Sequence, residues 1–427
     1  MSDVYIPPSE HPRIVLIGAG FAGLYFAKKL RNKPFQVVLI DKNNFHQFQP
    51  LFYQVATSGL EPDAITFSVR KIFRNCTNVI FRMADVQRID TEGQTLETDI
   101  GTIDYDYLVL ATGATNNFYG MDDVEAHSMG FKSIQESLDI RSLVLQNLEK
   151  AANTSDLAKK ERLTNIVIVG GGPAGVEMAG AFAEFHKFNF RGDYHDIDPG
   201  LFKVFLIEAG PSLLPAMSKK SSKSALNVLE RLGVHVHLNT AVEGYDGQEV
   251  RLGDTRIASE SLIWTAGIKA QYPFGLERAA VARGHRLTTD QFNKVQGYTN
   301  IYAIGDVAYM ETQAWPDGHP QVAPAAIQHG EHLAKNLLIG DPARWKPFKY
   351  FDKGALATIG KKRAVMDVGK AHAKGFIGWF IWATVHLFSI SGFKNRLRVG
   401  VNWINSYFSY DKRNRLIIRK YEKEGVK

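Results

Sequence analysis

Two glycine-rich segments have the residue types and the spacing to bind phosphate. The first has three glycines in the pattern GxGxxG: Gly18, Gly20 and Gly23. Such a loop can turn tightly and approach a pyrophosphate, and the helix that follows offers unpaired N–H groups and a positive dipole end. The next predicted strand, residues 36–40, ends in Asp41, whose carboxylate can accept hydrogen bonds from both ribose hydroxyls. Together these features predict a dinucleotide site.

The same pattern recurs in the middle of the chain, at Gly170, Gly172 and Gly175. These glycines follow an apolar run, residues 166–169, and Pro173 stands near the first helical turn, where its missing N–H costs little. The next strand ends at Glu208, after an insertion, residues 189–200, that we expect to be a loop with a helical fringe. Two such sites imply two dinucleotides. That pairing suits an oxidoreductase that passes electrons from a nicotinamide to a flavin.

The elements around these motifs predict an α/β fold with two Rossmann-like dinucleotide-binding domains. This layout resembles the two-dinucleotide-domain flavoprotein reductases, in which the first site holds FAD and the central site holds NAD(P)H. The resemblance implies that residues 105–114, which include Gly113, and residues 300–308 return the chain to the FAD domain. Asp306 would then hydrogen-bond the ribityl chain of FAD. Residues 262–268 would have the corresponding role at the nicotinamide site.

The predicted domains follow from this layout. We expect an FAD domain in two parts, residues 1–125 and 276–345, an inserted NADH domain, residues 126–275, and a C-terminal membrane-binding region, residues 346–427. NADH is favoured over NADPH because Glu208 can accept a hydrogen bond from a free 2′-hydroxyl and would repel a 2′-phosphate. No arginine follows it immediately.

The composition limits the class of electron acceptor. The chain has 427 residues, enough for two or three domains, and a single cysteine, Cys76. One cysteine excludes the cysteine pair of a disulfide reductase or a sulfide oxidoreductase, and we expect no metal site. The acceptor is then oxygen, a small soluble protein, or an organic molecule such as a quinone. The N-terminus has no apolar signal segment, and we expect no spanning helix.

Several stretches resemble the type II NADH:quinone oxidoreductases, the single-chain, non-proton-pumping NADH dehydrogenases. The matching segments are residues 43–65, 169–184, 207–215, 264–270, 301–308, 322–330, 354–367 and 392–417. The resemblance implies FAD as cofactor, NADH as co-substrate and a membrane quinone, menaquinone or ubiquinone, as acceptor in a respiratory chain. It also implies monotopic attachment to the cytoplasmic side of the cell inner membrane.

The resemblance and the local sequence give two candidates near the reacting centre, Glu177 and Gln328. Glu177 could affect binding or relay a proton; the alternative is a carboxylate that only the helix dipole stabilises. The family often has an AQxxxQ motif beside the quinone, but Pro324 replaces its first glutamine here and is expected to cap a helix. Gln328 is the second glutamine of the motif, or else an ordinary polar residue on a helix surface. We also expect residues 46–56 to line the flavin pocket.

The C-terminal region combines apolar helices with positive charge. Residues 376–390 have no formal charge and include Trp379 and Trp382, and from Phe351 onward 16 Lys and Arg face 5 Asp and Glu. A following helical stripe consists of Leu397, Val401, Ile404 and Phe408, with Trp403 and Tyr407 beside it and Asn402, Asn405, Ser406 and Ser409 as the polar face. Two such helices predict a platform on a membrane surface. The alternative is a pair of core or dimer-interface helices.

Two other functions stay open on the sequence. One is a soluble NADH:acceptor flavin reductase, and the other is a non-catalytic FAD-binding signalling protein. Nucleic-acid binding is not expected, because the basic residues flank apolar helices and do not form a groove with stacking aromatic residues. A homodimer is left open, because no pattern in the sequence supports or excludes one.

Overall fold

A computed structural model describes residues 3–408 and 414–422, except for the side chains of residues 406–408. The chain divides into two compact units. The first unit comprises residues 1–47, 66–115 and 268–353, and the second comprises residues 48–65, 116–267 and 354–427. The short segment 48–65 therefore packs within the second unit, although it follows the first glycine motif closely. The predicted domains were defined by the nucleotide or membrane that each would bind and not by compactness, and their boundaries stay a prediction.

The first unit is built on a five-stranded parallel sheet with the order β21-β9-β1-β2-β5. Its strands are β1 (Arg13–Ile17), β2 (Gln36–Asp41), β5 (Val79–Met83), β9 (Tyr107–Leu110) and β21 (Ile301–Ala303). Residues of β1 alternate between the two faces. Ile14 and Leu16 join one buried cluster, and Val15 and Ile17 join the other. This period of two is what a strand buried on both faces requires.

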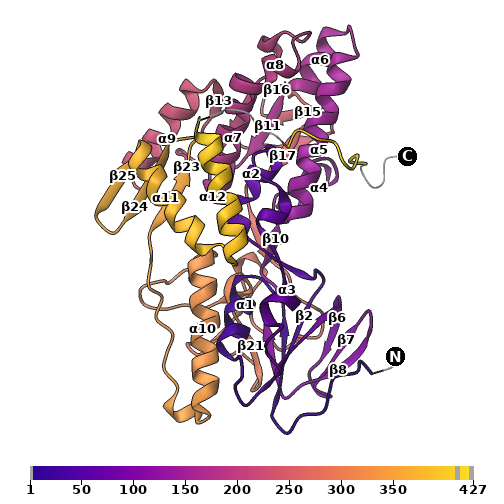
Figure 1. The fold of residues 1–427 in the computed structure, drawn as a ribbon, viewed down its shortest axis with the longest axis vertical. Helices are drawn as coiled ribbons and strands as arrows, with labels where there is room; N and C mark the ends of the chain where they lie inside the picture. The colour runs from indigo at the N-terminus through magenta and orange to yellow at the C-terminus, as the bar shows by residue number, and fades with distance from the viewer. Residues whose placement is uncertain (1–2, 409–413, 423–427) are drawn as a thin grey trace. The chain divides into compact units, whose positions relative to one another are not determined.

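Two helices cover one face of this sheet, and Figure 1 shows them side by side. They are α1 (Phe21–Lys29) and α10 (Ala323–Ile339). A side chain at Gly330 would overlap the carbonyl oxygen of Ala22, so glycine at this position lets the two helix backbones approach closely. Pro324 stands in the first turn of α10, as predicted.

Smaller elements complete the first unit. The strands are β3 (Phe45–Gln47), β4 (Thr66–Ser68), β6 (Val86–Asp90), β7 (Thr95–Thr98), β8 (Gly101–Asp104), β18 (Ile268–Ala270), β19 (Val281–Ala282), β20 (Arg286–Thr288) and β22 (Ala308–Tyr309), and the helix is α3 (Val69–Phe73). The strand β10 (Ala114–Asn116) lies where the chain leaves this unit.

The second unit has its own parallel sheet, with the order β13-β12-β11-β17. Its strands are β11 (Ile166–Val169), β12 (Val204–Ile207), β13 (Val234–His237) and β17 (Leu262–Trp264). The helices of this part are α4 (Asp122–His127), α5 (Ile134–Ala152), α6 (Leu157–Thr164), α7 (Pro173–Phe185), α8 (Arg191–Asp193) and α9 (Lys219–Arg231). An antiparallel sheet adds β14 (Gly244–Tyr245), β15 (Glu249–Leu252) and β16 (Thr255–Ala258). The predicted helical fringe of the insertion is confirmed, because α7 continues through a π-helical turn, His186–Phe190, into α8.

Residues 354–408 and the segment 48–65 pack onto this second sheet domain. The helix α2 (Phe52–Ala56) lies against α5 and α7. An antiparallel sheet contributes β23 (Ala355–Thr358), β24 (Ala364–Val368) and β25 (Ala371–Lys374), and two helices follow, α11 (Gly375–Ser389) and α12 (Phe393–Phe408). β23 contacts α7, and α11 contacts β24. No helix within the described ranges has both the length and the apolar character needed to cross a membrane.

Candidate functional site: two nucleotide cradles and a tryptophan-lined pocket

The first glycine motif forms the turn between β1 and α1, and each glycine meets a different steric demand. Gly18 has φ +104°, a conformation that side chains disfavour, and a Cβ there would overlap Ala111. A Cβ at Gly23 would overlap the carbonyl oxygen of Gly18. A Cβ at Gly20 would meet nothing within 4 Å. That empty space beside the N-terminus of α1 is what a bound pyrophosphate needs.

Asp41 ends β2 and closes onto this turn. Its Oδ2 accepts a hydrogen bond from the backbone N–H of Ala19 at 2.7 Å, and its Oδ1 accepts one from Asn43 at 2.7 Å. Burial raises the pKa of the carboxyl, although the two backbone N–H groups oppose this effect. Each oxygen keeps further lone pairs, so the geometry fits a ribose with its two hydroxyls.

The second motif repeats this geometry around α7. Gly170 has φ +112°, a Cβ at Gly175 would overlap the Gly170 carbonyl oxygen, and a Cβ at Gly172 would meet nothing within 4 Å. Glu208 follows β12, as Asp41 ends β2. Its Oε2 accepts a hydrogen bond from the N–H of Gly171 at 2.5 Å, and its Oε1 accepts one from Gly210 at 2.6 Å.

Gly113 and Asp306 follow neighbouring strands of the first sheet. Gly113 comes after β9 and Asp306 after β21, so both lie beyond the carboxyl edge of the sheet, beside the turn after β1. This is the edge where open α/β sheets bind their ligands. The N–H of Gly305 donates to Nδ1 of His329 at 3.2 Å, and the Gln321 amide donates to the carbonyl oxygen of Asp306 at 2.9 Å. The sequence did not indicate these two supports of the turn.

Glu177 is buried on α7, with 8% of its surface exposed. Its Oε1 accepts a hydrogen bond from the backbone N–H of Thr358 at 3.2 Å. Burial raises the pKa of the carboxyl to about 8, and the bonds from Thr358 oppose that effect only in part. The helix dipole would lower the pKa, so burial outweighs the dipole. The side chain therefore holds a proton at neutral pH.

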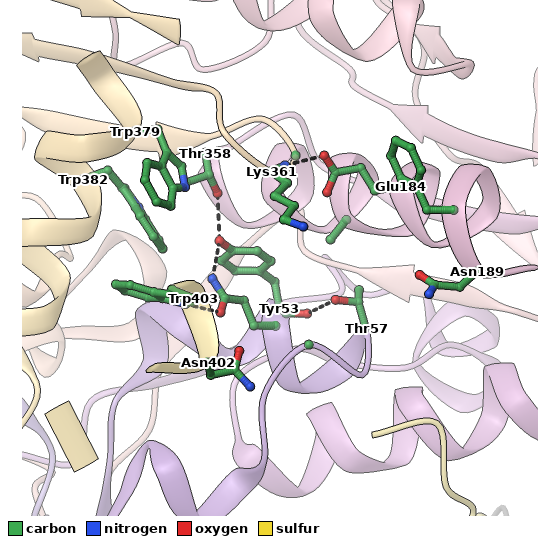
Figure 2. Close-up of a pocket in the computed structure, with 15 residues that line it drawn as sticks. Tyr53, Thr57, Glu184, Asn189, Thr358, Lys361, Trp379, Trp382, Asn402 and Trp403 are labelled. Atoms are coloured by element: carbon green, nitrogen blue, oxygen red, sulfur yellow. Dashed lines mark hydrogen bonds between the residues drawn. The ribbon is translucent and has the colours of Figure 1, made fainter. Parts of the chain in front are cut away.

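A chain of hydrogen bonds leads away from this carboxyl group. Thr358 Oγ1 lies 3.5 Å from Glu177 Oε1 and 2.8 Å from the hydroxyl of Tyr53. The Gln54 amide donates to that hydroxyl at 2.9 Å, and the Trp403 indole N–H donates to Gln54 Oε1 at 2.9 Å. Figure 2 shows the hydrogen bond between Tyr53 and Thr358. Burial raises the pKa of Tyr53, so its hydroxyl stays neutral and can both accept and donate a proton.

These side chains form one wall of a pocket in the second unit that holds about 760 Å³, including the solvent at its mouth. The lining comes from α2, α7 and its π-helical extension, the end of β23 with the turn after it, α11 and α12: Tyr53, Gln54, Thr57, Gly59, Ala181, Glu184, Phe188, Asn189, Thr358, Gly360, Lys361, Trp379, Trp382, Asn402 and Trp403. Trp382 is almost fully buried, and its ring centroid lies 5.1 Å from that of Trp403 and 4.3 Å from that of His386. The pocket therefore joins flat aromatic walls to a few polar groups, as small-molecule sites do.

The opposite faces of α11 and α12 expose a row of large apolar side chains: Phe376, Ile377, Phe380, Val385, Phe388, Phe393, Leu397, Val401 and Ile404. The predicted stripe of α12 is thus an exposed face for three of its members, and the side chains of Ser406, Tyr407 and Phe408, like all of Ser409, lie outside the described residues. Asn402 belongs to the pocket and not to a solvated polar face. The start of α12 is held by Asn395, whose amide donates to the carbonyl oxygens of Asp63 and Ala64, and by an Arg398–Asp63 ion pair.

The side chain of Gln328 hydrogen-bonds backbone groups. Its amide donates to the carbonyl oxygens of Pro324 and Phe351, and its Oε1 accepts the N–H of Phe351, so the side chain fastens residue 351 to α10 in the first unit. These contacts explain the glutamine without a ligand, and its role at the reacting centre stays a prediction. The predicted flavin-lining segment 46–56 is divided. His46 belongs to the first unit and bonds the Ala19 carbonyl oxygen at 2.8 Å, whereas α2 lines the pocket of the second unit.

Comparison with known proteins identifies the family. Residues 12–330 match the pyridine nucleotide-disulphide oxidoreductase family, and residues 353–409 match the NDH2 C-terminal domain. The chain is 34% identical to the type II NADH:quinone oxidoreductase Ndh of Mycobacterium tuberculosis, over 94% of this chain and 89% of that protein. The chain belongs to the type II NADH:quinone oxidoreductases. NdhA of the same organism, which is named for the same activity, is also 34% identical, over 92% of this chain and 86% of its own length.

Members of this family oxidise NADH and reduce quinone with FAD as cofactor and without proton pumping, and this is the activity of the protein. Solved structures confirm the fold. NDH2 from Plasmodium falciparum in complex with NADH superposes with a TM-score of 0.88 over 96% of this chain and all of that chain, at 21% identity. The predicted fold class, cofactor and acceptor class are confirmed, and the activity favours a quinone over a soluble acceptor or a non-catalytic role.

Burial of Glu177 has a consequence for stability. Below about pH 4.5 the carboxyl is protonated in both the folded and the unfolded chain, whereas between about pH 4.5 and 8 only the folded chain keeps the proton. The free energy of unfolding therefore falls as pH rises through this window, by about 1.4 kcal/mol per pH unit for this one group. Glu177→Gln should lack that loss. We expect thermal midpoints of the FAD-loaded proteins to diverge in favour of the variant between about pH 5 and 8; parallel curves would contradict the raised pKa.

Proposed function

We propose that the tryptophan-lined pocket binds the quinone headgroup and that Glu177 supplies one of the protons the quinone takes up. The observation that carries this proposal is the path of close polar contacts from the buried Glu177 carboxyl group, whose pKa burial raises to about 8, through Thr358 to Tyr53 in the pocket wall. The aromatic rings of Trp382 and Trp403 suit a flat headgroup.

The same proposal assigns the nucleotide sites. Gly18, Gly20, Gly23, Asp41, Gly113 and Asp306 would hold FAD, and Gly170, Gly172, Gly175 and Glu208 would hold NADH. The empty space at Gly20 and at Gly172 supports both assignments, because each lies at the N-terminus of a helix where a pyrophosphate binds. Glu208 would select NADH by accepting a bond from the free 2′-hydroxyl. FAD, when bound, accepts hydride from NADH and passes the two electrons to the quinone.

Glu177, Thr358 and Tyr53 would transfer a proton to the quinone. Reduction of a quinone to a quinol takes two electrons and two protons. Glu177 loses its proton to Thr358 Oγ1, Thr358 passes its own hydroxyl proton to Tyr53, and Tyr53 donates its hydroxyl proton to one quinone oxygen. Each hydroxyl accepts one proton as it gives one, so the ionised Glu177 is the only charge left, and it is neutralised again by a proton from water. A donor with a pKa near the working pH is suited to this transfer.

The exposed apolar row of α11 and α12 would rest on a lipid surface. Phe376, Phe380 and Phe388 stand more than half exposed on α11, and the same helix turns Trp379 and Trp382 toward the pocket. One helix pair would thus touch lipid on one face and the quinone on the other. The positive charge of the region favours an anionic membrane surface. These features support a peripheral, monotopic enzyme, and its position on the cytoplasmic side of the inner membrane stays a prediction. A homodimer stays a prediction that no contact tests.

Tyr53→Phe tests the proton route. The change keeps the ring in the wall and removes the hydroxyl that bonds Thr358 and Gln54, so we expect quinone turnover to fall by about 10- to 100-fold. Reduction of FAD by NADH and FAD content should not change. The measurement is stopped-flow spectroscopy of both half-reactions. Tyr5→Phe, at an exposed tyrosine of the first unit, is the control. Wild-type turnover in Tyr53→Phe would refute the route.

Phe380→Glu with Phe388→Glu tests the lipid-binding face. Both side chains are more than half exposed, so the changes should leave folding intact and weaken binding to lipid vesicles. We expect reduction of a long-chain quinone in vesicles to fall by about 10-fold or more, while ferricyanide reduction is retained. Co-sedimentation with vesicles of neutral and anionic lipids measures binding. The control is Phe274→Glu, at an exposed phenylalanine of the first unit. Full binding by the double variant would contradict the proposal.

A further inference from the structure

The helix α7 and the turn after β23 meet at backbone contact. A Cβ at Gly180 would lie 2.6 Å from the backbone nitrogen of Gly360, so only glycine permits this approach. A Cβ at Gly360, which has φ +69°, would lie 2.6 Å from Glu184 Oε1. The residues on both sides of Gly360 are therefore held against the helix.

Two carboxylates of α7 receive backbone N–H groups from this segment. Glu177 and Glu184 are seven residues apart, which places them on the same face of the helix about 10 Å from each other along its axis. The N–H of Thr358 donates to Glu177, and the N–H of Lys361 donates to Glu184 in a short hydrogen bond. In both cases a backbone N–H of the segment donates to a carboxyl group of α7. Both Thr358 and Lys361 line the pocket.

The side chain of Lys361 lines the pocket. Figure 2 shows it extending from the turn beside Glu184 toward the side of the pocket where Tyr53 and Thr57 lie. Burial lowers the pKa of the ammonium group to about 8, with Glu184 raising it and Lys362 lowering it further. A lysine with this property loses a proton near neutral pH more readily than an exposed one.

The stoichiometry of the reaction requires a second proton donor. The two oxygens of a quinone lie on opposite sides of its ring, so one donor in the wall cannot reach both. We propose that Lys361 is a catalytic residue that donates the second proton directly to the second quinone oxygen. An N–H bond of the ammonium breaks, an O–H bond of the quinol forms, and the neutral amine regains a proton from solvent water. This inference rests on the proposal that the pocket binds the quinone.

The charged and titratable groups around Lys361 support the direction of this transfer. Glu184 faces it from α7 and Lys362 from its own turn, Tyr53 lines the same pocket from α2, and His386 on α11 stacks on Trp382 of the wall. Burial lowers the pKa of His386 to about 4 and raises that of Tyr53, so neither ionises near pH 8.

Lys361→Met, Lys361→Arg and the control Lys370→Met test the inference. With a soluble short-chain quinone, we expect Lys361→Met to lower kcat at neutral pH by about 10-fold or more. The loss of rate above about pH 8 should become shallower, because one ionisation in place of two controls it. Lys361→Arg keeps the charge but cannot release a proton, so KM should stay within about 2-fold while kcat falls. Lys370→Met, at an exposed lysine between β24 and β25, should match the wild type.

Three results would overturn the inference. One is a wild-type kcat and pH profile in Lys361→Met, and another is loss of FAD or slower FAD reduction by NADH in that variant, which would show a structural role. If Lys361→Met does not fold, Lys361→Arg decides, and full activity with an unchanged pH profile would refute proton donation. Tyr53→Phe separates the two proposals: if it loses turnover while the Lys361 variants do not, the pocket holds the quinone and only the second donor is wrong.

Discussion

Burial of the Glu177 carboxyl group against the backbone of Thr358 is the interaction on which the rest of the site depends. An ionised carboxylate in this position would lose its hydration and gain only one backbone N–H and a distant hydroxyl in return. Protonation is the less costly solution, and it raises the pKa to about 8. The same contact fixes β23 on α7 and so brings Thr358 within hydrogen-bond distance of Tyr53. The burial of Glu177 against Thr358 therefore both raises the pKa of the carboxyl group and connects that group to Tyr53.

The helix α7 would join the two proposed substrate sites within one unit. Its N-terminus, after Gly172, would offer N–H groups to the nicotinamide nucleotide, and its side carries Glu184 to the tryptophan-lined pocket and Glu177 to Thr358. Two glycines of the helix each permit a different close approach. Gly175 lets it approach β11, and Gly180 lets it approach the turn after β23. A helix so closely packed on two sides keeps its carboxyl groups in place.

The sequence predicted the parts of the molecule that local spacing determines. The two glycine motifs, with Asp41 and Glu208 at the ends of the next strands, lie where a strand–turn–helix pattern requires, and α11 spans almost the predicted residues. The partnership of Tyr53 with Thr358 was not predicted, because 305 positions separate the two residues. Lys361 gave no signal either, because lysines are common in that region and only the contact through Gly360 turns this one toward the pocket. The amide of Gln328 was expected at the reacting centre, yet what it visibly binds is the backbone of Phe351.

The protonation state of Glu177 tests the account most directly. Infrared difference spectra of the FAD-loaded protein, compared with Glu177→Gln, would isolate the C=O band of this one carboxyl group as pH is varied. The account predicts a protonated band at neutral pH that disappears with a midpoint near pH 8. A carboxyl that is already ionised at about pH 6, near the ordinary range for glutamate, would contradict it.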